Sequence, residues 1–216
     1  MREKTVEWAL KEKIIAIVRG MEAKDCLRVA QALYDGGIRL MEITYDQRDP
    51  AQWAKTADAI GKIAEAFEGR MLVGAGTVTT PELVTRTRDA GGQFIISPDT
   101  NPAVIARTRE LELVSMPGAM TPSEILAAHA AGADLVKLFP AAALGSAYLK
   151  AVRSPISHVR IMAVGGVDLA NAEAFFKAGA ACIGVGSSLV SKKLIDSGDY
   201  AQITARAEGF VRAAGK

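Results

Sequence analysis

Short apolar segments that recur along the whole chain constrain its fold more than any other feature. They are rich in Ile, Val, Leu and Met, and they occupy residues Ile14–Val18, Leu40–Thr44, Met71–Val73, Phe94–Ile96, Leu113–Met116, Leu135–Phe139, Ile161–Val164 and Cys182–Val185. Their hydrophobicity is nearly continuous and does not alternate. This is typical of strands that are covered on both faces, and it therefore predicts a parallel sheet.

Helical patterns fill the segments between these runs. Residues 23–34 place Cys26, Val29, Ala30 and Leu33 on one helical face. A polar residue followed by proline predicts a helix start at Thr80-Pro81, Asn101-Pro102 and Thr121-Pro122. Glycines predict helix ends at Gly36-Gly37, Gly91-Gly92, Gly132 and Gly179. The chain therefore alternates strand and helix.

This alternation predicts a (β/α)8 TIM barrel that is preceded by an N-terminal helix within residues 1–13. The 216 residues suit one such domain over residues 1–216, because barrels of about 200 to 250 residues fold around one core. An open doubly wound sheet is the alternative. It usually carries G-x-G-x-x-G after the first strand, whereas Arg19-Gly20-Met21 stands here. Residues 191–200 are expected to be the loop before the last helix.

Composition excludes several classes of function. The chain has 26 basic and 24 acidic residues, without the basic stripe and interleaved aromatic residues that nucleic-acid binding needs. No apolar run approaches the roughly 20 residues of a membrane-spanning helix. Cys26 and Cys182 lack the spacing of a metal or redox site. We therefore expect no metal, no nucleic-acid or membrane partner, and a reducing, cytoplasmic location.

The carboxyl ends of the predicted strands carry the residues on which chemistry could depend. In a barrel these ends surround one mouth, where the active site lies. In chain order they are Arg19, Glu42 with Thr44, Gly74 to Thr77, Ser97-Pro98, Met116 to Gly118, Lys137 with Phe139, Val164 to Gly166 and Gly184 to Ser188. We expect the polar members of this set to converge.

Lys137 is the strongest candidate for a catalytic group. Strand alternation places it on one face with Leu135 and Phe139, so its ammonium form would lose much of its hydration. Desolvation lowers the pKa of a lysine, and a neutral amine is a nucleophile. This pattern indicates Schiff-base chemistry with a carbonyl substrate. The alternative is that Lys137 ends its strand and extends its ammonium group to solvent.

Glu42 and Arg19 are its expected neighbours across the mouth. Glu42 lies among apolar residues, which raises the pKa of a carboxyl group and suits a proton shuttle. The alternative for Glu42 is a structural ion pair with Arg19 or Lys137. Arg19 is always protonated and can bind a carboxylate or phosphate, and its charge would disfavour the ammonium form of Lys137. Arg19 could instead cap the rim of the barrel or pair with Glu42.

Two glycine clusters end the last two predicted strands, at Gly165-Gly166 and at 184–188. Glycines allow backbone N–H groups to approach an anion closely, and the loops after the seventh and eighth strands commonly bind phosphate in this fold. The alternative is that these glycines only end helices and form turns. We predict a phosphate site there.

Motifs along nearly the whole chain carry a resemblance to a known family. They are Ile15 to Arg19, Gly36-Gly37-Ile38 leading to Glu42-Ile43-Thr44, Gly74 to Val78, Ile96-Ser97-Pro98, Met116-Pro117-Gly118, Val136 to Pro140, Gly165-Gly166-Val167 and Gly184 to Ser187. With these motifs the chain resembles the 2-keto-3-deoxy-6-phosphogluconate (KDPG) and 4-hydroxy-2-oxoglutarate (KHG) aldolases, which are class I, metal-free lyases that form pyruvate.

The resemblance assigns roles to residues. It implies that Lys137 forms the imine and that Glu42 transfers protons. Keto-acid binding would fall to Arg19, Thr77 and Pro98, with Phe139 packed beside the lysine. Phosphate binding would fall to Gly165, Gly166, Gly186 and Ser187. It also implies a homotrimer, no cofactor, and as substrate a phosphorylated keto-deoxy sugar acid that is cleaved to pyruvate and glyceraldehyde 3-phosphate.

The chain departs from the family's best-known members at two positions. Those members have an arginine where this chain has Asp46, and a carboxylate there cannot bind the carboxylate of the substrate. They have a threonine where this chain has Val164, which resembles the phosphogalactonate branch. The preferred epimer is therefore open, and so is activity on the unphosphorylated 4-hydroxy-2-oxoglutarate.

Two other classes of function stay open. The glycine clusters also fit a phosphosugar isomerase or epimerase, or a thiazole or pyrimidine phosphate synthase, none of which needs a lysine in an apolar sixth strand. Asp46 and Val164 would also fit a catalytically silent phosphosugar-binding or regulatory protein. Lys137 distinguishes the aldolase from both.

Overall fold

Each apolar segment that was expected to be a strand forms one in the computed structural model, which describes residues 2–216. The strands are β1 (Ile14–Arg19), β2 (Leu40–Thr44), β3 (Leu72–Gly76), β4 (Phe94–Ile96), β5 (Val114–Met116), β6 (Gly118–Ala119), β7 (Val136–Leu138), β8 (Ile161–Val164) and β9 (Cys182–Val185). All of their pairings are parallel, in the order β5-β4-β3-β2-β1-β9-β8-β7-β6. The predicted TIM-barrel class is confirmed, and the open doubly wound sheet is wrong.

The fifth strand of the barrel is split in two, which the sequence did not predict. Pro117 separates β5, which pairs with β4, from β6, which pairs with β7. Pro117 has no backbone N–H to donate, but its carbonyl oxygen accepts a hydrogen bond of 2.8 Å from Lys137 N. The Ser115 carbonyl oxygen likewise accepts a bond of 2.9 Å from Asp134 N. These bonds close the barrel between β5, β6 and β7.

The strand β3 extends further than its apolar run indicated. The prediction ended at Val73, but the ladder with β2 continues to Gly76. Glycine lowers strand propensity, so the end of β3 was missed. A Cβ at Gly74 would lie 2.5 Å from the ring of Phe94 on β4, so close packing between neighbouring strands requires glycine here.

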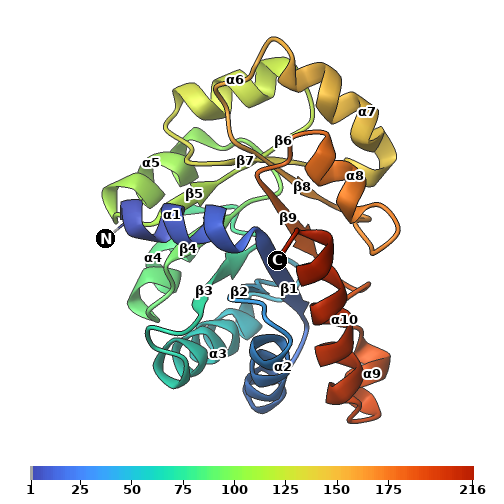
Figure 1. The fold of residues 1–216 in the computed structure, drawn as a ribbon. Coiled ribbons are helices and arrows are strands. Elements are labelled where there is room, and N and C mark those ends of the chain that lie inside the picture. The colour runs from blue at the N-terminus through green and yellow to red at the C-terminus, as the bar shows by residue number, and fades with distance from the viewer. Residues whose placement is uncertain (1) are drawn as a thin grey trace.

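Helices surround the barrel on all sides in Figure 1. They are α1 (Arg2–Glu12), α2 (Ala23–Asp35), α3 (Trp53–Ala66), α4 (Pro81–Asp89), α5 (Pro102–Glu110), α6 (Pro122–Ala130), α7 (Ala141–Arg153), α8 (Ala172–Lys177), α9 (Lys192–Asp196) and α10 (Tyr200–Ala213), with a 3-10 turn η1 at Pro50–Gln52. The stretch 191–200 was expected to be a loop and instead contains α9. No described helix is both long and apolar enough to cross a membrane.

The predicted helix ends are confirmed by their hydrogen bonds. Thr80, Asn101 and Thr121 accept backbone N–H bonds as N-caps, each with proline next in the chain, and Thr121 forms a full capping box with Glu124. The glycines that close helices have positive φ at Gly37, Gly91, Gly132 and Gly179. These ends fix how long each helix is before the chain returns to the barrel.

Two apolar cores divide the molecule into layers. One lies between the strands and the outer helices, and the other fills the barrel interior with side chains that include Ile15, Leu40, Leu135 and Met162. The predicted N-terminal helix is present as α1, and its Val6 and Ala9 join the interior core. Figure 1 shows α1 lying across one end of the barrel. The amino ends of the strands are thereby sealed, which leaves the carboxyl ends for the site.

Asp134 anchors α1 to that sealed end. Its carboxylate pairs with Arg2 of α1 and lies 3.6 Å from Arg109, and it accepts a hydrogen bond of 2.9 Å from Ser115 N. Asp134 directly precedes Leu135 in the interior core. The segment that leads into β7 is therefore fixed at its start, which sets the alternation that points Lys137 into the barrel.

Candidate active site

The predicted site residues all line one cavity of about 740 Å³ at the carboxyl ends of the strands. They are Arg19, Glu42, Thr77, Pro98, Lys137, Phe139, Gly165, Gly166, Gly186 and Ser187. These residues therefore converge at the barrel mouth as expected, whereas Thr44 and Ser97, which belong to the same set, do not line this cavity. The alternation expected along β7 also holds, because Val136 and Leu138 join the outer core while Leu135 lies inside the barrel.

Lys137 is buried, with only 7% of its surface exposed. This does not fit a side chain that extends to solvent. Its Nζ lies 4.7 Å from the centre of the Phe139 ring. Burial is the main cause that lowers the pKa of Lys137; Glu42 and Asp99 oppose this effect, and the positive charge of Arg19 adds to it. The amine is thus shifted toward its neutral, nucleophilic form.

Glu42 lies in β2, paired with Ile17 on one side and with Gly74 on the other, and is 2% exposed. Burial raises the pKa of its carboxyl group to about 7, against the lowering effect of the charges on Lys137 and Arg19. Its Oε2 is buried and has no hydrogen-bond partner among residues 2–216. No hydrogen bond to this oxygen therefore stabilises the charged form of the carboxyl group.

Gly76 makes the space in which the Glu42 carboxyl group lies. A Cβ at this position would overlap with Glu42 Oε1 and would lie 2.7 Å from Glu42 Cδ and 2.9 Å from Thr44 Cγ2. Because Gly76 pairs with Thr44 in the ladder between β2 and β3, its backbone cannot easily move away. The glycine is therefore a steric requirement of the carboxyl position.

Thr77 follows Gly76 with φ of 58°, a conformation that is strained for a β-branched residue. Gln47, in the loop after β2, holds it there: Gln47 Nε2 donates to the Thr77 carbonyl oxygen at 2.8 Å, and the Thr79 hydroxyl donates to Gln47 Oε1 at 2.8 Å. The motifs did not indicate Gln47, because a polar residue in a loop carries no periodic signal.

The glycine clusters form the opposite wall of the cavity. Gly165 and Gly166 have φ of 94° and 75°, which L side chains rarely adopt. A Cβ at Gly165 would also lie 2.9 Å from the ring of Phe139. The loop after β9 contributes Gly186 and Ser187, so two neighbouring glycine loops border one space.

Further residues line the cavity. Val164, Gly184 and Ser188 belong to the strand ends that were expected there, and the lining residues that were not predicted are Ile17, Met21, Val167, Asp168, Val190, Ser191 and Lys192. Asp168 and Lys192 are the charged members of this set. Both lie beyond the strand ends, in segments whose position depends on how the loops fold back. Only a tertiary structure could place them at the cavity.

Asp46, where the best-known relatives have arginine, does not line this cavity. It lines a neighbouring one of about 740 Å³. Its carboxylate accepts hydrogen bonds of 3.1 and 2.9 Å from the Arg48 guanidinium, which is the main cause that lowers the pKa of Asp46 to about 2. The two cavities share Arg19, Met21, Thr77 and Lys192.

The two histidines are close to each other but lie elsewhere. The rings of His129 and His158 are 5.2 Å apart between centres, and neither residue lines the cavity. Within residues 2–216, no group of three or more His, Cys, Asp or Glu side chains is arranged to hold a metal ion.

A closed parallel barrel whose mouth holds a buried amine and a buried carboxyl group in one cavity fits the class of enzymes that work through a lysine imine. A family described as "KDPG and KHG aldolase" matches residues 6–206. The chain belongs to this family.

Individual relatives agree with this assignment. A Rhizobium meliloti protein named "Probable 2-dehydro-3-deoxy-6-phosphogalactonate aldolase" is 39% identical over 89% of this chain and 88% of its own. A Treponema pallidum 2-dehydro-3-deoxy-phosphogluconate aldolase is 33% identical over 94% of both chains. The solved structure of the Legionella pneumophila KDPG aldolase, with pyruvate captured as a covalent carbinolamine, is 30% identical with a TM-score of 0.82, over 92% of this chain and 94% of that one.

Replacing Gly76 with alanine tests the steric requirement. We expect Gly76→Ala to displace the Glu42 carboxyl group, to lower the rate of pyruvate release at least tenfold, and to cost about 1–3 kcal/mol of unfolding free energy through overpacking. Steady-state kinetics and urea unfolding measure both effects. Gly61→Ala is the control, because Gly61 lies within helix α3 and a Cβ there meets only Ala90 O, at 3.4 Å. Full activity in Gly76→Ala would contradict the argument.

Proposed function

We propose that this chain is a class I aldolase that cleaves a 2-keto-3-deoxy-6-phospho sugar acid to pyruvate and glyceraldehyde 3-phosphate. The observation that carries the proposal is the buried amine of Lys137, whose pKa is lowered by burial, in a cavity that also holds the buried carboxyl group of Glu42. The covalent pyruvate adduct of the Legionella relative supports it.

The keto acid binds with its carboxylate toward Arg19 and the backbone at Thr77, and with its keto carbon toward Lys137. Pro98 and Phe139 border the small apolar space that the keto-acid end occupies. The phosphate lies at the other wall, near Gly165, Gly166, Gly186 and Ser187. A sugar acid of this kind therefore has one anionic group for each end of the cavity.

Burial prepares both reacting groups for imine formation. It favours the neutral amine of Lys137 and the protonated carboxyl group of Glu42. The amine nitrogen attacks the keto carbon and forms a carbinolamine. Glu42 then gives its proton to the carbinolamine hydroxyl, which leaves as water, and a positively charged iminium ion remains on Lys137.

The new positive charge converts Glu42 from an acid into a base, because an opposite charge nearby lowers the pKa of a carboxyl group. The Glu42 carboxylate takes the proton of the C4 hydroxyl, the C3–C4 bond breaks, and its electrons move into the iminium ion to give an enamine. Glyceraldehyde 3-phosphate leaves. Protonation of the enamine at C3 and hydrolysis of the imine release pyruvate and restore the amine.

Val164 favours the galactonate-derived substrate over the gluconate-derived one. Its side chain lines the cavity where the best-known members have a threonine hydroxyl, and the Rhizobium relative carries a phosphogalactonate name. The same steps apply to 4-hydroxy-2-oxoglutarate, which would give pyruvate and glyoxylate. An isomerase or a silent phosphosugar-binding barrel would need no imine, so the trapping experiment below separates these functions from an aldolase.

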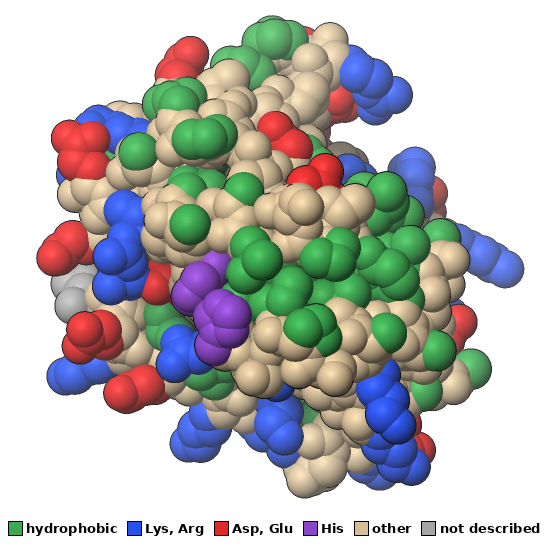
Figure 2. Space-filling model, turned by 90° about the horizontal axis from the view of Figure 1, so that it is seen from above, with side chains coloured by type: hydrophobic (Ala, Val, Ile, Leu, Met, Phe, Trp, Pro, Cys, Tyr) green, Lys and Arg blue, Asp and Glu red, His purple; other side chains and the backbone are tan. Residues whose placement is uncertain are grey.

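The assembly we propose is a homotrimer that forms through the face carrying α6 and α7. Figure 2 shows apolar side chains gathered on this face. Leu126 of α6 is 43% exposed, and Met120, which directly precedes the N-cap of α6, is 45% exposed. Exposed apolar patches commonly mark interfaces. We place the enzyme in the cytoplasm, where the two free cysteines would stay reduced.

Reductive trapping tests the role of Lys137. We expect borohydride to fix pyruvate on the wild-type chain, with the mass shift located in the peptide that contains Lys137, because the imine is reduced to a stable amine. Mass spectrometry of the digested protein measures it. Lys137→Met, with a similar shape but no amine, is the control and should stay unmodified. An adduct on another lysine, or none, would rule out this mechanism.

Glu42→Gln tests the proton transfers. We expect it to lower kcat by about 10²- to 10⁴-fold, the usual contribution of a general acid–base group. The wild-type pH profile should contain a limb near pH 7 from the raised pKa of Glu42, and the residual activity of the variant should lack it. Rates close to wild type would indicate that Glu42 has only a structural role.

The pH dependence of the unfolding free energy also tests the raised pKa of Glu42. The folded pKa of Glu42, about 7, lies above its ordinary value of 4.5, so the folded protein binds more protons between these two pH values. Wild-type stability should therefore fall as the pH rises from about 5 to 7, by up to roughly 3 kcal/mol from this group. This decline should be weaker in Glu42→Gln. An identical decline in the two proteins would contradict the burial argument.

A further inference from the structure

The charged residues of the catalytic cavity fall into two sets. Arg19, Glu42 and Lys137 serve the keto-acid end under the function proposed above. The remaining charged lining residues are Asp168 and Lys192, which follow the two glycine loops in the chain. A phosphate monoester carries a charge of about −1.5 to −2 at neutral pH. Backbone N–H groups and the Ser187 hydroxyl can bind it, but the carboxylate of Asp168 in the same wall opposes it.

We propose that Lys192 binds the phosphate group of the substrate and thereby makes the enzyme prefer phosphorylated sugar acids. This inference rests on the proposed aldolase function. With Arg19 and Lys137 committed to the keto acid, Lys192 is the cation left among the described lining residues to offset both the phosphate and Asp168.

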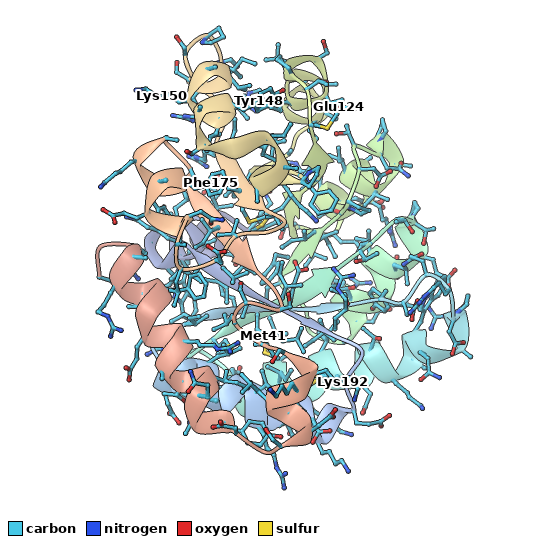
Figure 3. The ribbon with its side chains drawn as sticks, turned by 90° about the vertical axis from the view of Figure 1, so that its right-hand side faces the viewer. Met41, Glu124, Tyr148, Lys150, Phe175 and Lys192 are labelled. Carbon is cyan, nitrogen blue, oxygen red and sulfur yellow. The ribbon has the colours of Figure 1, made fainter. Side chains whose placement is uncertain are left out.

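The backbone holds Lys192 at a fixed place relative to the glycine loop. Leu189 N and Val190 N both donate to the Gly186 carbonyl oxygen at 2.9 Å, so the chain turns immediately after the loop. The Ser191 side chain then caps α9 by accepting from Leu194 N. Lys192 is the first residue of this helix, and its side chain is labelled in Figure 3. Its Cα is therefore positioned, while its long side chain stays free to move.

The present partner of Lys192 is weak enough to be exchanged. Its Nζ lies 2.9 Å from Asp196 Oδ1, one turn further along α9, with side-chain exposures of 86% and 59%. Such exposed pairs contribute little to stability. A phosphate held in a partly enclosed cavity carries more charge and offers more acceptor oxygens, so the ammonium group would leave Asp196 for it.

The position of Lys192 also suits the entry of the substrate. It lines the neighbouring cavity together with Arg19, Met21 and Thr77, so it stands where the two cavities meet. A mobile cation at this junction would attract an anionic ligand to the mouth and would then bind its phosphate inside. Lys193, the next residue, is also exposed but lines neither cavity, which makes it a matched control.

Kinetics on one sugar acid with and without its phosphate tests the proposal. The ratio of kcat/KM for the phosphorylated over the dephosphorylated compound should fall about tenfold in Lys192→Ala, mainly through KM, as expected when a charge-assisted hydrogen bond is lost. Lys192→Arg should restore most of the ratio because it keeps the charge. Lys193→Ala should leave it unchanged. An unchanged ratio in Lys192→Ala, or an equal loss in Lys193→Ala, would overturn the proposal.

Binding of inorganic phosphate, measured by calorimetry, separates this inference from the proposed function because it needs no turnover. Weaker binding in Lys192→Ala than in Lys193→Ala would support the phosphate contact even if the wild type cleaved no sugar acid. In that case the aldolase proposal alone would fail. A wild type that cleaves the substrate and a Lys192→Ala variant that binds phosphate equally well would refute the role of Lys192 alone.

Discussion

The site depends on one physical constraint, which is that an amine and a carboxyl group are buried in the same apolar barrel mouth. Burial disfavours the charged form of both, so it lowers the pKa of Lys137 and raises that of Glu42 to about 7. A strong ion pair would oppose these shifts and leave an inert ammonium ion. Within residues 2–216, Glu42 Oε2 has no hydrogen-bond partner, so no bond to this oxygen stabilises the charged carboxylate. In the proposed reaction, the nucleophile and the acid are thus prepared by the same cause.

Such an arrangement needs a rigid surrounding, because a mobile mouth would let water in and restore the charged forms. The interior core below the site, which α1 covers and Asp134 anchors, makes one side of the site rigid. The strand ladder at Gly76 makes another side rigid, because only a residue without Cβ leaves room for the Glu42 carboxyl group beside an intact ladder. The strained backbone of Thr77 and its clamp by Gln47 belong to the same set of constraints.

The sequence predicted the features that depend on local pattern. Alternation placed Lys137 with Leu135 on the inner face of β7, and proline after a polar residue located the starts of α4, α5 and α6. Features that depend on tertiary contacts were missed. The split at Pro117 follows from pairing with two different strands, and the end of β3 was hidden by glycines whose need arises from neighbouring side chains. Gln47 and Asp168 lie in loops, where no periodic signal exists, and Lys192 begins α9 within a stretch that was expected to be a loop.

The two departures from the best-known relatives are of different kinds. Val164 acts directly, because its side chain faces the cavity and cannot donate a hydrogen bond there. Asp46 acts less than its charge indicates, because the Arg48 guanidinium holds it outside the catalytic cavity and offsets its charge. Asp46 still interacts electrostatically with Arg19, because both residues line the neighbouring cavity. Under the proposed function, selectivity for the sugar is then decided at Val164 and at the phosphate wall, while the keto-acid end keeps the electrostatics that imine formation requires.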